Sequence, residues 1–348
     1  MRIGLVLGGG GVIGLAYHAA ALTAIEHDLA WDPRTADIVV GTSAGSLVGA
    51  MLRRNIPASD LSAIAVGAQP KASPPGVVRA LSQRPDLPPL RLLSLLGRPP
   101  RLPDPGLITA WLRRPWRFDP VSAMASVIPD GRLELSEHAG AIEEVLGSAW
   151  PAARLWICTV RQRDMRRVVM GRDVEARLSE AVAASCAIPG YFRPIAIDGH
   201  SYIDGGVRSP TNADVLRRAD LDLAIIVSPM SGRSLRGAGA ALLVRRHAKA
   251  KVEHERDRLH DAGIPTVLIE PSAEVIEAQG RDFMSDARVV DIVRAAFLDT
   301  GEQLRAPFNR TLLAGLDGRT HTATADSPGR RRRPRRAPRR PGRRFGGV

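Results

Sequence analysis

The chain has 348 residues, of which 44% are apolar and 24% charged, a balance that excludes a fibrous or wholly disordered protein. Its two cysteines, Cys158 and Cys186, exclude a disulfide scaffold and a four-thiolate zinc site. The net charge of +13 comes mainly from ten arginines between Arg330 and Arg344. Without them the 49 basic residues fall to 39, against 36 acidic ones, so the body of the chain is nearly neutral.

The arginine-rich segment predicts a disordered Arg/Pro-rich tail over residues 320–348. A block of like charge interleaved with proline repels itself and lacks the apolar residues of a core. One interpretation is an arm for anionic lipid or nucleic acid, and the other is a solvated extension. We expect no specific nucleic-acid partner, because the basic charge describes this tail and not the body.

Residues 3–25 carry no charged side chain apart from His18, so a signal peptide or membrane span has to be considered. Four consecutive glycines, Gly8 to Gly11, make this stretch a poor helix. Only Arg2 supplies a positive n-region, and no other stretch approaches the length of a spanning helix. The sequence therefore predicts a soluble, cytoplasmic protein. Peripheral membrane contact would come through residues 69–120 or the basic tail.

The first elements alternate between strand and helix. Residues 2–7 (RIGLVL) and 36–40 (ADIVV) are short apolar runs typical of buried strands. Residues 14–27 and 44–53 follow them as helices. This order predicts an α/β fold whose parallel sheet is connected by crossover helices.

Residues 69–120 contain twelve prolines, which exclude long helices and central strands. We expect an irregular insertion with one or two short amphipathic helices, among them the apolar piece 90–96 (LRLLSLL). Such a long insertion is either a lid over an apolar site or a surface excursion packed on the core. The sequence favours neither.

The alternation resumes at residue 155, and one α/β domain is expected over residues 1–310. The Asp198-Gly199 dipeptide between two apolar runs predicts a hairpin. The expected strands are 155–160, 167–170, the hairpin 194–203, 223–227 and 266–270, and the expected helices are 178–187, 240–260 and 287–298.

A glycine-rich segment, GGGGVIG over residues 8–14, directly follows the first strand. Gly9, Gly11 and Gly14 match a dinucleotide fingerprint, but the second strand ends without the carboxylate that would hold a ribose. A P-loop is excluded because no Gly-Lys-Ser/Thr follows. Converging backbone N–H groups at a helix N-terminus suit an oxyanion better. The loop is therefore a candidate oxyanion hole.

The segment GTSAG, residues 41–45, lies between the second strand and its helix. In G-x-S-x-G the serine occupies a strained turn from strand to helix, and its hydroxyl points away from the sheet. Ser43 is therefore a candidate nucleophile, with a serine N-cap as the structural alternative.

A nucleophilic serine needs a base, and the histidines lack a suitable context. His138, His200, His247, His254, His260 and His321 follow Ser43, but none has the setting of a triad base. Nor does their spacing suggest a metal site, since His247 and His254 are seven residues apart. Asp204 is the better candidate, because it ends a hairpin strand and precedes Gly205-Gly206. Asp198 also precedes a glycine, but a turn explains it fully.

In this order, the glycine-rich loop, G-x-S-x-G and the distant D-G-G resemble the patatin-like phospholipase family over roughly residues 1–310. The segment 184–190 (ASCAIPG) is also similar to that family. The resemblance implies a three-layer α/β/α fold with a mainly parallel sheet, and hydrolysis of lipid acyl esters without metal or cofactor. Ser43 and Asp204 would form the dyad. The matching glycines are Gly9, Gly10 and Gly11 of the oxyanion loop, and Gly14, Gly41, Gly45, Gly205 and Gly206 of the motifs.

One position departs from the family, which usually has arginine or lysine just before the last glycine of the loop. This chain has Ile13 there. The backbone donors survive that change, so we expect a phospholipase, lysophospholipase or esterase, with a neutral ester or lysolipid as the better substrate. The alternative is a non-catalytic lipid-binding or scaffold protein that keeps the fold.

Overall fold

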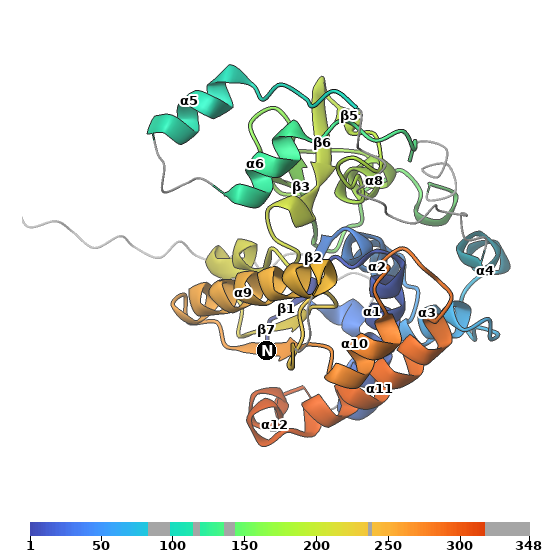
Figure 1. The fold of residues 1–348 in the computed structure, drawn as a ribbon. Helices are drawn as coiled ribbons and strands as arrows, with labels where there is room; N and C mark the ends of the chain where they lie inside the picture. The colour runs from blue at the N-terminus through green and yellow to red at the C-terminus, as the bar shows by residue number, and fades with distance from the viewer. Residues whose placement is uncertain (83–97, 114–118, 136–142, 236–238, 317–348) are drawn as a thin grey trace, which may run out of the picture.

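A computed structural model of the chain describes residues 1–82, 98–113, 119–135, 143–235 and 239–316 (Figure 1). The predicted tail and the apolar piece 90–96 lie outside the described residues.

The centre of the molecule is a sheet whose strands run in the order β5-β6-β3-β2-β1-β7-β8, with β4 paired to β3. Neighbours from β3 to β8 are parallel, whereas β4, β5 and β6 pair in antiparallel fashion at the β3 edge. This is the predicted, mainly parallel sheet. The strands are β1 Ile3–Leu7, β2 Ile38–Thr42, β3 Leu155–Arg161, β4 Arg166–Met170, β5 Ile195–Ile197, β6 His200–Asp204, β7 Leu223–Val227 and β8 Thr266–Ile269.

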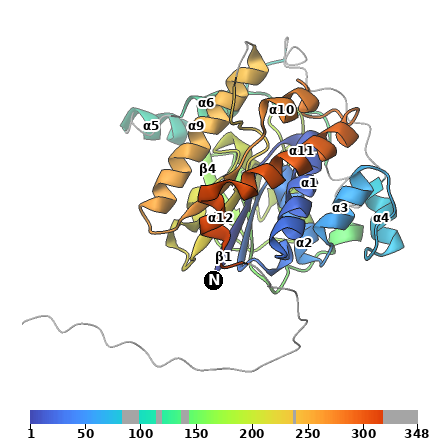
Figure 2. The ribbon, with the colours of Figure 1, turned by 90° about the horizontal axis from the view of Figure 1, so that it is seen from below.

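Helices cover both faces of this sheet. Alternate residues of a strand point to opposite faces, so Leu5 and Leu7 of β1 pack with α1 (Gly11–Leu29) and α11 (Val289–Arg305). Val6 packs on the other face, where α9 (Ala240–His260) lies. Figure 2 shows α9 on one side of the strands and α1, α2 (Ala44–Arg53) and α3 (Ala58–Ala65) on the other. The predicted three-layer α/β/α fold is confirmed.

Most predicted elements appear with shifted ends. The second helix, α2, occupies the predicted residues, whereas α1 begins at Gly11 inside the glycine run and not at Gly14. Helix α8 is Leu178–Ser185, and α11 extends well beyond the predicted end at residue 298. The sequence analysis did not anticipate α3, α10 (Ala273–Gln279) or α12 (Pro307–Leu313), which are each only seven or eight residues long.

Within the described part of residues 69–120 there are two short helices, α4 Pro75–Ser82 and α5 Pro105–Arg113, and a third, α6 Pro120–Val127, begins at the last residue of this range. Each begins with a proline, which the first turn of a helix tolerates because its N–H has no partner there. Leu107 of α5 and Ala125 of α6 are buried against Val160 and Ile203 of the sheet. These two helices are therefore packed on the core. In the described residues, no helix is long and apolar enough to cross a bilayer.

Candidate active site

Ser43 sits on a strained turn between β2 and α2. Its φ of 52° and ψ of −123° put a residue other than glycine in a sparsely populated conformation. The flanking glycines make this turn possible. A Cβ on Gly45 would lie 2.0 Å from the Leu7 carbonyl oxygen, and a Cβ on Gly41 would lie 2.5 Å from the Cα of Ser46. Only glycine fits at either place, so the spacing of G-x-S-x-G follows from sterics.

The backbone of Ser43 is held from α8. The Ser43 N–H donates to the Ser185 hydroxyl at 2.9 Å, and that hydroxyl donates to the Cys158 carbonyl of β3 at 2.7 Å. Ser185 is fully buried. The sequence analysis did not single out Ser185, although it lies in the segment 184–190. Its hydroxyl fixes the serine turn to the neighbouring strand.

Asp204 meets Ser43 from the other side. It ends β6, and the side chain of Ser43 is close enough to lower the pKa of its carboxyl group. Its Oδ1 accepts the Gly206 N–H at 2.7 Å, and its own N–H donates to the Ala187 carbonyl at 2.9 Å. Both Ser43 and Asp204 are 6% exposed. The structure therefore brings together two residues that are 161 positions apart in the sequence.

Burial changes the acidity of Asp204. Desolvation raises the pKa of its carboxyl group to about 6, and the hydrogen bonds from Gly206 and Ser43 act in the opposite direction. Asp204 is thus ionised at neutral pH, yet more basic than an ordinary aspartate. That combination is what a general base needs near pH 7.

The glycine-rich loop lies against the serine. A Cβ on Gly9 would be 3.3 Å from the Cβ of Ser43. The Gly9 N–H already donates to the Pro210 carbonyl at 2.8 Å, whereas in the described part of the chain no acceptor bonds the N–H groups of Gly10 and Gly11. The three candidate donors are therefore not equivalent. Gly10 and Gly11, at the N-terminus of α1, are the two that could face an oxyanion.

Ile13 does not face this loop. Its side chain is 2% exposed and belongs to the hydrophobic core, while its N–H donates to the Phe283 carbonyl at 3.3 Å. A buried cation nevertheless lies behind the loop. Arg245 of α9 stacks on the Phe283 ring at 5.5 Å, and its Nη1 donates to the Pro229 and Ser231 carbonyls at 3.1 Å. Burial lowers the pKa of its guanidinium to about 10, so it stays charged at neutral pH.

The segment after D-G-G braces the site, and the sequence analysis missed it. Asn212 is fully buried and left-handed, with φ 52° and ψ 29°. Its amide donates to the Gly205 carbonyl at 3.2 Å and to the Thr42 hydroxyl at 3.1 Å. Glu255 of α9 accepts from the Thr211 hydroxyl at 2.5 Å. The signal available in the sequence was the polar cluster SPTN directly after the D-G-G segment.

Among the histidines that the structure describes, none contacts Ser43 or Asp204 by a hydrogen bond, and His138 and His321 lie outside the described residues. His18 of α1 bonds the Gly8 carbonyl at 2.6 Å, and burial lowers its pKa to about 4, so it is neutral. His247 and His260 lie on α9, as predicted, and His200 lies at the exposed start of β6. Within the described residues, no cluster of three or more His, Cys, Asp or Glu side chains could hold a metal ion.

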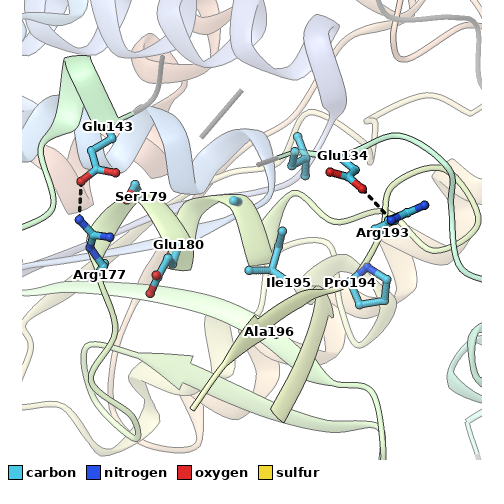
Figure 3. A pocket seen from close by; sticks show the side chains of 11 residues that line it. Glu134, Glu143, Arg177, Ser179, Glu180, Arg193, Pro194, Ile195 and Ala196 are labelled. Carbon is cyan, nitrogen blue, oxygen red and sulfur yellow. Dashed lines mark hydrogen bonds and ion pairs between the residues drawn. The ribbon is translucent and has the colours of Figure 1, made fainter. Parts of the chain in front are cut away.

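A cavity of about 550 Å³ opens beside α8, but neither Ser43 nor Asp204 lines it (Figure 3). Two ion pairs cross its wall, Arg177 to Glu143 at 2.7 Å and Arg193 to Glu134 at 2.6 Å. With its charged lining and its distance from the reacting groups, this cavity is not the acyl site. We assign it no role in the chemistry.

Comparison with known proteins identifies a family. A family model described as patatin-like phospholipase matches residues 5–217. Solved structures with a similar fold include VipD from Legionella pneumophila, at 13% identity and TM-score 0.43, covering 90% of this chain and 67% of that one. The type III effector protein ExoU matches at 17% identity and TM-score 0.35, covering 90% and 53%. ExoU in its heterodimeric complex with SpcU, from Pseudomonas aeruginosa, matches at 17% and 0.36, covering 90% and 52%.

The chain thus spans between half and two thirds of the length of these structures. A separate comparison with curated proteins finds none that matches.

Replacing Ser185 tests how the serine turn is held. In Ser185→Ala, the Ser43 N–H and the Cys158 carbonyl both lose their partner, at a cost of about 1–3 kcal/mol for each buried group. We expect kcat for a soluble ester to fall roughly 5- to 100-fold while KM stays within about twofold, because the turn loses its fixed geometry. Ser179→Ala on the same helix is the control. A loss confined to KM would contradict a positioning role.

The raised pKa of Asp204 also predicts a dependence of stability on pH. The pKa of about 6 in the folded chain exceeds the ordinary aspartate value of 3.8, so burying the carboxylate destabilises the fold by roughly 3 kcal/mol above pH 6 and by nothing below pH 4. Asp204→Asn should therefore raise the free energy of unfolding at pH 8 and leave it nearly unchanged at pH 4. Urea titrations at the two pH values measure both. An equal change at both would show that the carboxylate charge is not the cause.

Proposed function

The chain belongs to the patatin-like phospholipase family, and from this premise we propose that it hydrolyses lipid acyl esters with Ser43 as nucleophile and Asp204 as general base. Family membership supports a lipid acyl hydrolase in general. The more specific assignment rests on one observation. The side chain of the serine on the strained turn lowers the pKa of a buried carboxyl group, that of Asp204, which burial raises to about 6.

In the proposed first step, the Ser43 hydroxyl oxygen attacks the ester carbonyl carbon while its proton passes to the Asp204 carboxylate. The carbonyl oxygen becomes an oxyanion and accepts hydrogen bonds from the N–H groups of Gly10 and Gly11. Gly9 keeps the loop in place through its bond to Pro210. Removing one donor from such a hole typically costs about 2.7–4 kcal/mol of barrier.

Collapse of the tetrahedral species breaks the ester C–O bond, and the leaving alcohol takes the proton from Asp204. Water then attacks the carbonyl carbon of the acyl-serine and gives a proton to Asp204. Collapse of this second tetrahedral species breaks the bond between the acyl carbon and the Ser43 Oγ, which takes the proton back from Asp204 as the fatty acid leaves. The same carboxylate acts as base and then as acid in each half. The chain's own groups are sufficient for every proton transfer.

The surroundings of the loop bear on the substrate. Ile13 is buried in the core, so that position offers no cation for a substrate phosphate. The guanidinium of Arg245 is occupied with backbone carbonyls and with Gln279. We therefore propose a neutral ester or a lysolipid as the preferred substrate. The other candidate is a lipid-binding scaffold that keeps the fold without turnover, which the absence of a cation at Ile13 would also fit.

The decisive experiment removes each member of the dyad. Ser43→Ala and Asp204→Asn should each lower turnover of a soluble short-chain ester by at least about 10³-fold, and the double variant should be little worse, because the two act as a unit. Asp198→Asn is the matched control, since Asp198 also precedes a glycine but lies in the hairpin turn.

Covalent labelling separates the two candidate functions. A fluorophosphonate should label the wild-type chain at Ser43, and label it far less in Asp204→Asn. Full activity in Asp204→Asn would mean that another group is the base. A wild-type chain that neither reacts nor turns over ester would leave the scaffold as the function.

The pH profile follows from the same carboxyl group. Only ionised Asp204 can accept the serine proton, so kcat/KM should rise with pH and level off above its pKa of about 6. Below that value it should fall about tenfold for each pH unit. Initial rates on a soluble ester between pH 4 and 8 measure this, with a far-ultraviolet spectrum at each pH to exclude unfolding. A flat profile across this range would contradict the assignment of the base.

A further inference from the structure

Helices α5 and α6 carry apolar side chains on two faces. On the inner face, Leu107 and Ala125 are buried against Ile203 and Val207. On the outer face, Leu112 of α5 is 78% exposed and Met124 of α6 is 53% exposed. A surface helix normally places polar residues there. The outer face of this pair is therefore built for an apolar contact that the described chain does not supply.

The exposed side chains belong together. On α5, Ile108 and Leu112 lie four residues apart, and on α6, Met124 and Val127 lie three apart. Residues at these spacings share one face of a helix. The Arg101 N–H donates to the Val127 carbonyl at 2.9 Å, which places Leu102, 89% exposed, beside the end of α6. Both views show α5 next to α6 at the edge of the molecule (Figures 1 and 2). We call this the α5–α6 surface: Leu102, Ile108, Leu112, Met124 and Val127.

The exposed apolar side chains are concentrated in this part of the molecule. Among the described residues, ten large apolar side chains stand out as exposed, and five of them belong to the α5–α6 surface. The other five are distributed over α9, α11 and α12. Single exposed apolar residues are ordinary on a protein surface, whereas a cluster marks a site of contact.

Charge indicates the kind of contact. The described stretch 98–113, which carries Leu102 and α5, contains three arginines and one aspartate, while the body as a whole is nearly neutral. On the surface itself, Arg113 is exposed directly beside Leu112. Apolar side chains flanked by cations suit the interface of an anionic bilayer. The apolar side chains enter the acyl region, and the anionic headgroups attract the cations.

We propose that the α5–α6 surface docks the protein on an anionic phospholipid bilayer. This rests on the proposed function in one respect, that a bilayer is where a lipid hydrolase meets its substrate. The placement fits. Val207 lies three residues after Asp204, and an ion pair of 3.6 Å joins Arg208 to Asp119 at the start of α6. Docking would bring the D-G-G end of β6 towards the membrane.

A site-specific probe tests the docking in the full chain. Cysteine is introduced by Met124→Cys, where the side chain is 53% exposed, or, as the matched control, by Phe308→Cys on α12, where it is 63% exposed. Burial raises the pKa of both native thiols to about 12, so they should label slowly near pH 7. An environment-sensitive fluorophore at 124 should shift to the blue on vesicles of phosphatidylcholine and phosphatidylglycerol, and the label at 308 should not. Equal shifts at both positions, or none at 124, would overturn the proposal.

Binding affinity gives a second, independent measurement. In a Ser43→Ala background, Leu102→Ser with Leu112→Ser should bind these vesicles about tenfold more weakly or worse. Leu298→Ser with Phe308→Ser, on α11 and α12, should bind like the parent. The arginine tail is present in every variant, so it cannot produce this difference. Repeating the titration in high salt weakens the contribution of the tail and should leave the difference between the variants.

The remaining outcomes are distinguishable. If the blue shift at 124 depends on protein concentration without vesicles, the occupant is a second copy and the proposal is wrong. Vesicle binding is measured without turnover, so its failure says nothing against the dyad. Conversely, vesicle binding that persists while the wild-type chain hydrolyses no ester would overturn the proposed function alone. With serine 43 intact, turnover of a soluble ester by the double leucine variant should equal that of the parent.

Discussion

The candidate site depends on backbones that approach one another more closely than any Cβ allows. Gly45 lies against the Leu7 carbonyl, so the serine turn packs directly on the end of β1. Gly205 lies against the Cys158 carbonyl, where a Cβ would come within 2.3 Å, so the end of β6 packs directly on β3. These contacts bring the ends of β1, β2 and β6 close together. The side chains of Ser43 and Asp204 come together there, beside the glycine-rich loop.

Hydrogen bonds then fix what the close packing permits. The segment from Pro210 to Asn212 reaches all three parts of the site. The Pro210 carbonyl accepts the Gly9 N–H of the loop, and the Asn212 amide donates to the Gly205 carbonyl and to the Thr42 hydroxyl next to Ser43. Buried Glu255 anchors the segment from α9. The layer of helix behind the sheet therefore stabilises the site through the backbone of one short segment, which explains why a polar stretch of the chain is so completely buried.

The sequence was sufficient for the parts of this arrangement that depend on local sterics. Glycine spacing around Ser43, the strand before it and the helix after it follow from residues within ten positions of each other, and α2 was predicted to the residue. The roles of Ser185 and Asn212 could not be predicted in this way, because their partners lie 142 and 170 positions away. The hydrogen bond from the Gly9 N–H to the Pro210 carbonyl could not be predicted for the same reason. In the sequence, three adjacent glycines look equivalent, and only the distant carbonyl distinguishes Gly9 from the other two. The short helices α3, α10 and α12 were missed because seven or eight residues give little periodicity.

The proposed use of Asp204 as the base would impose a balance that a histidine base would not. A fully solvated aspartate is too weakly basic to take a proton from serine, and burial corrects this by disfavouring the charge. Burial without partners would go too far and leave the group protonated at neutral pH. The Gly206 N–H and the Ser43 hydroxyl limit the rise, and the pKa of Asp204 stays at about 6. The second glycine of D-G-G thus helps to set the acidity of the residue that precedes it. Gly205 thus has a steric reason, since it allows the close approach to β3, whereas the electrostatic effect at 206 comes from a backbone N–H that any residue other than proline could supply.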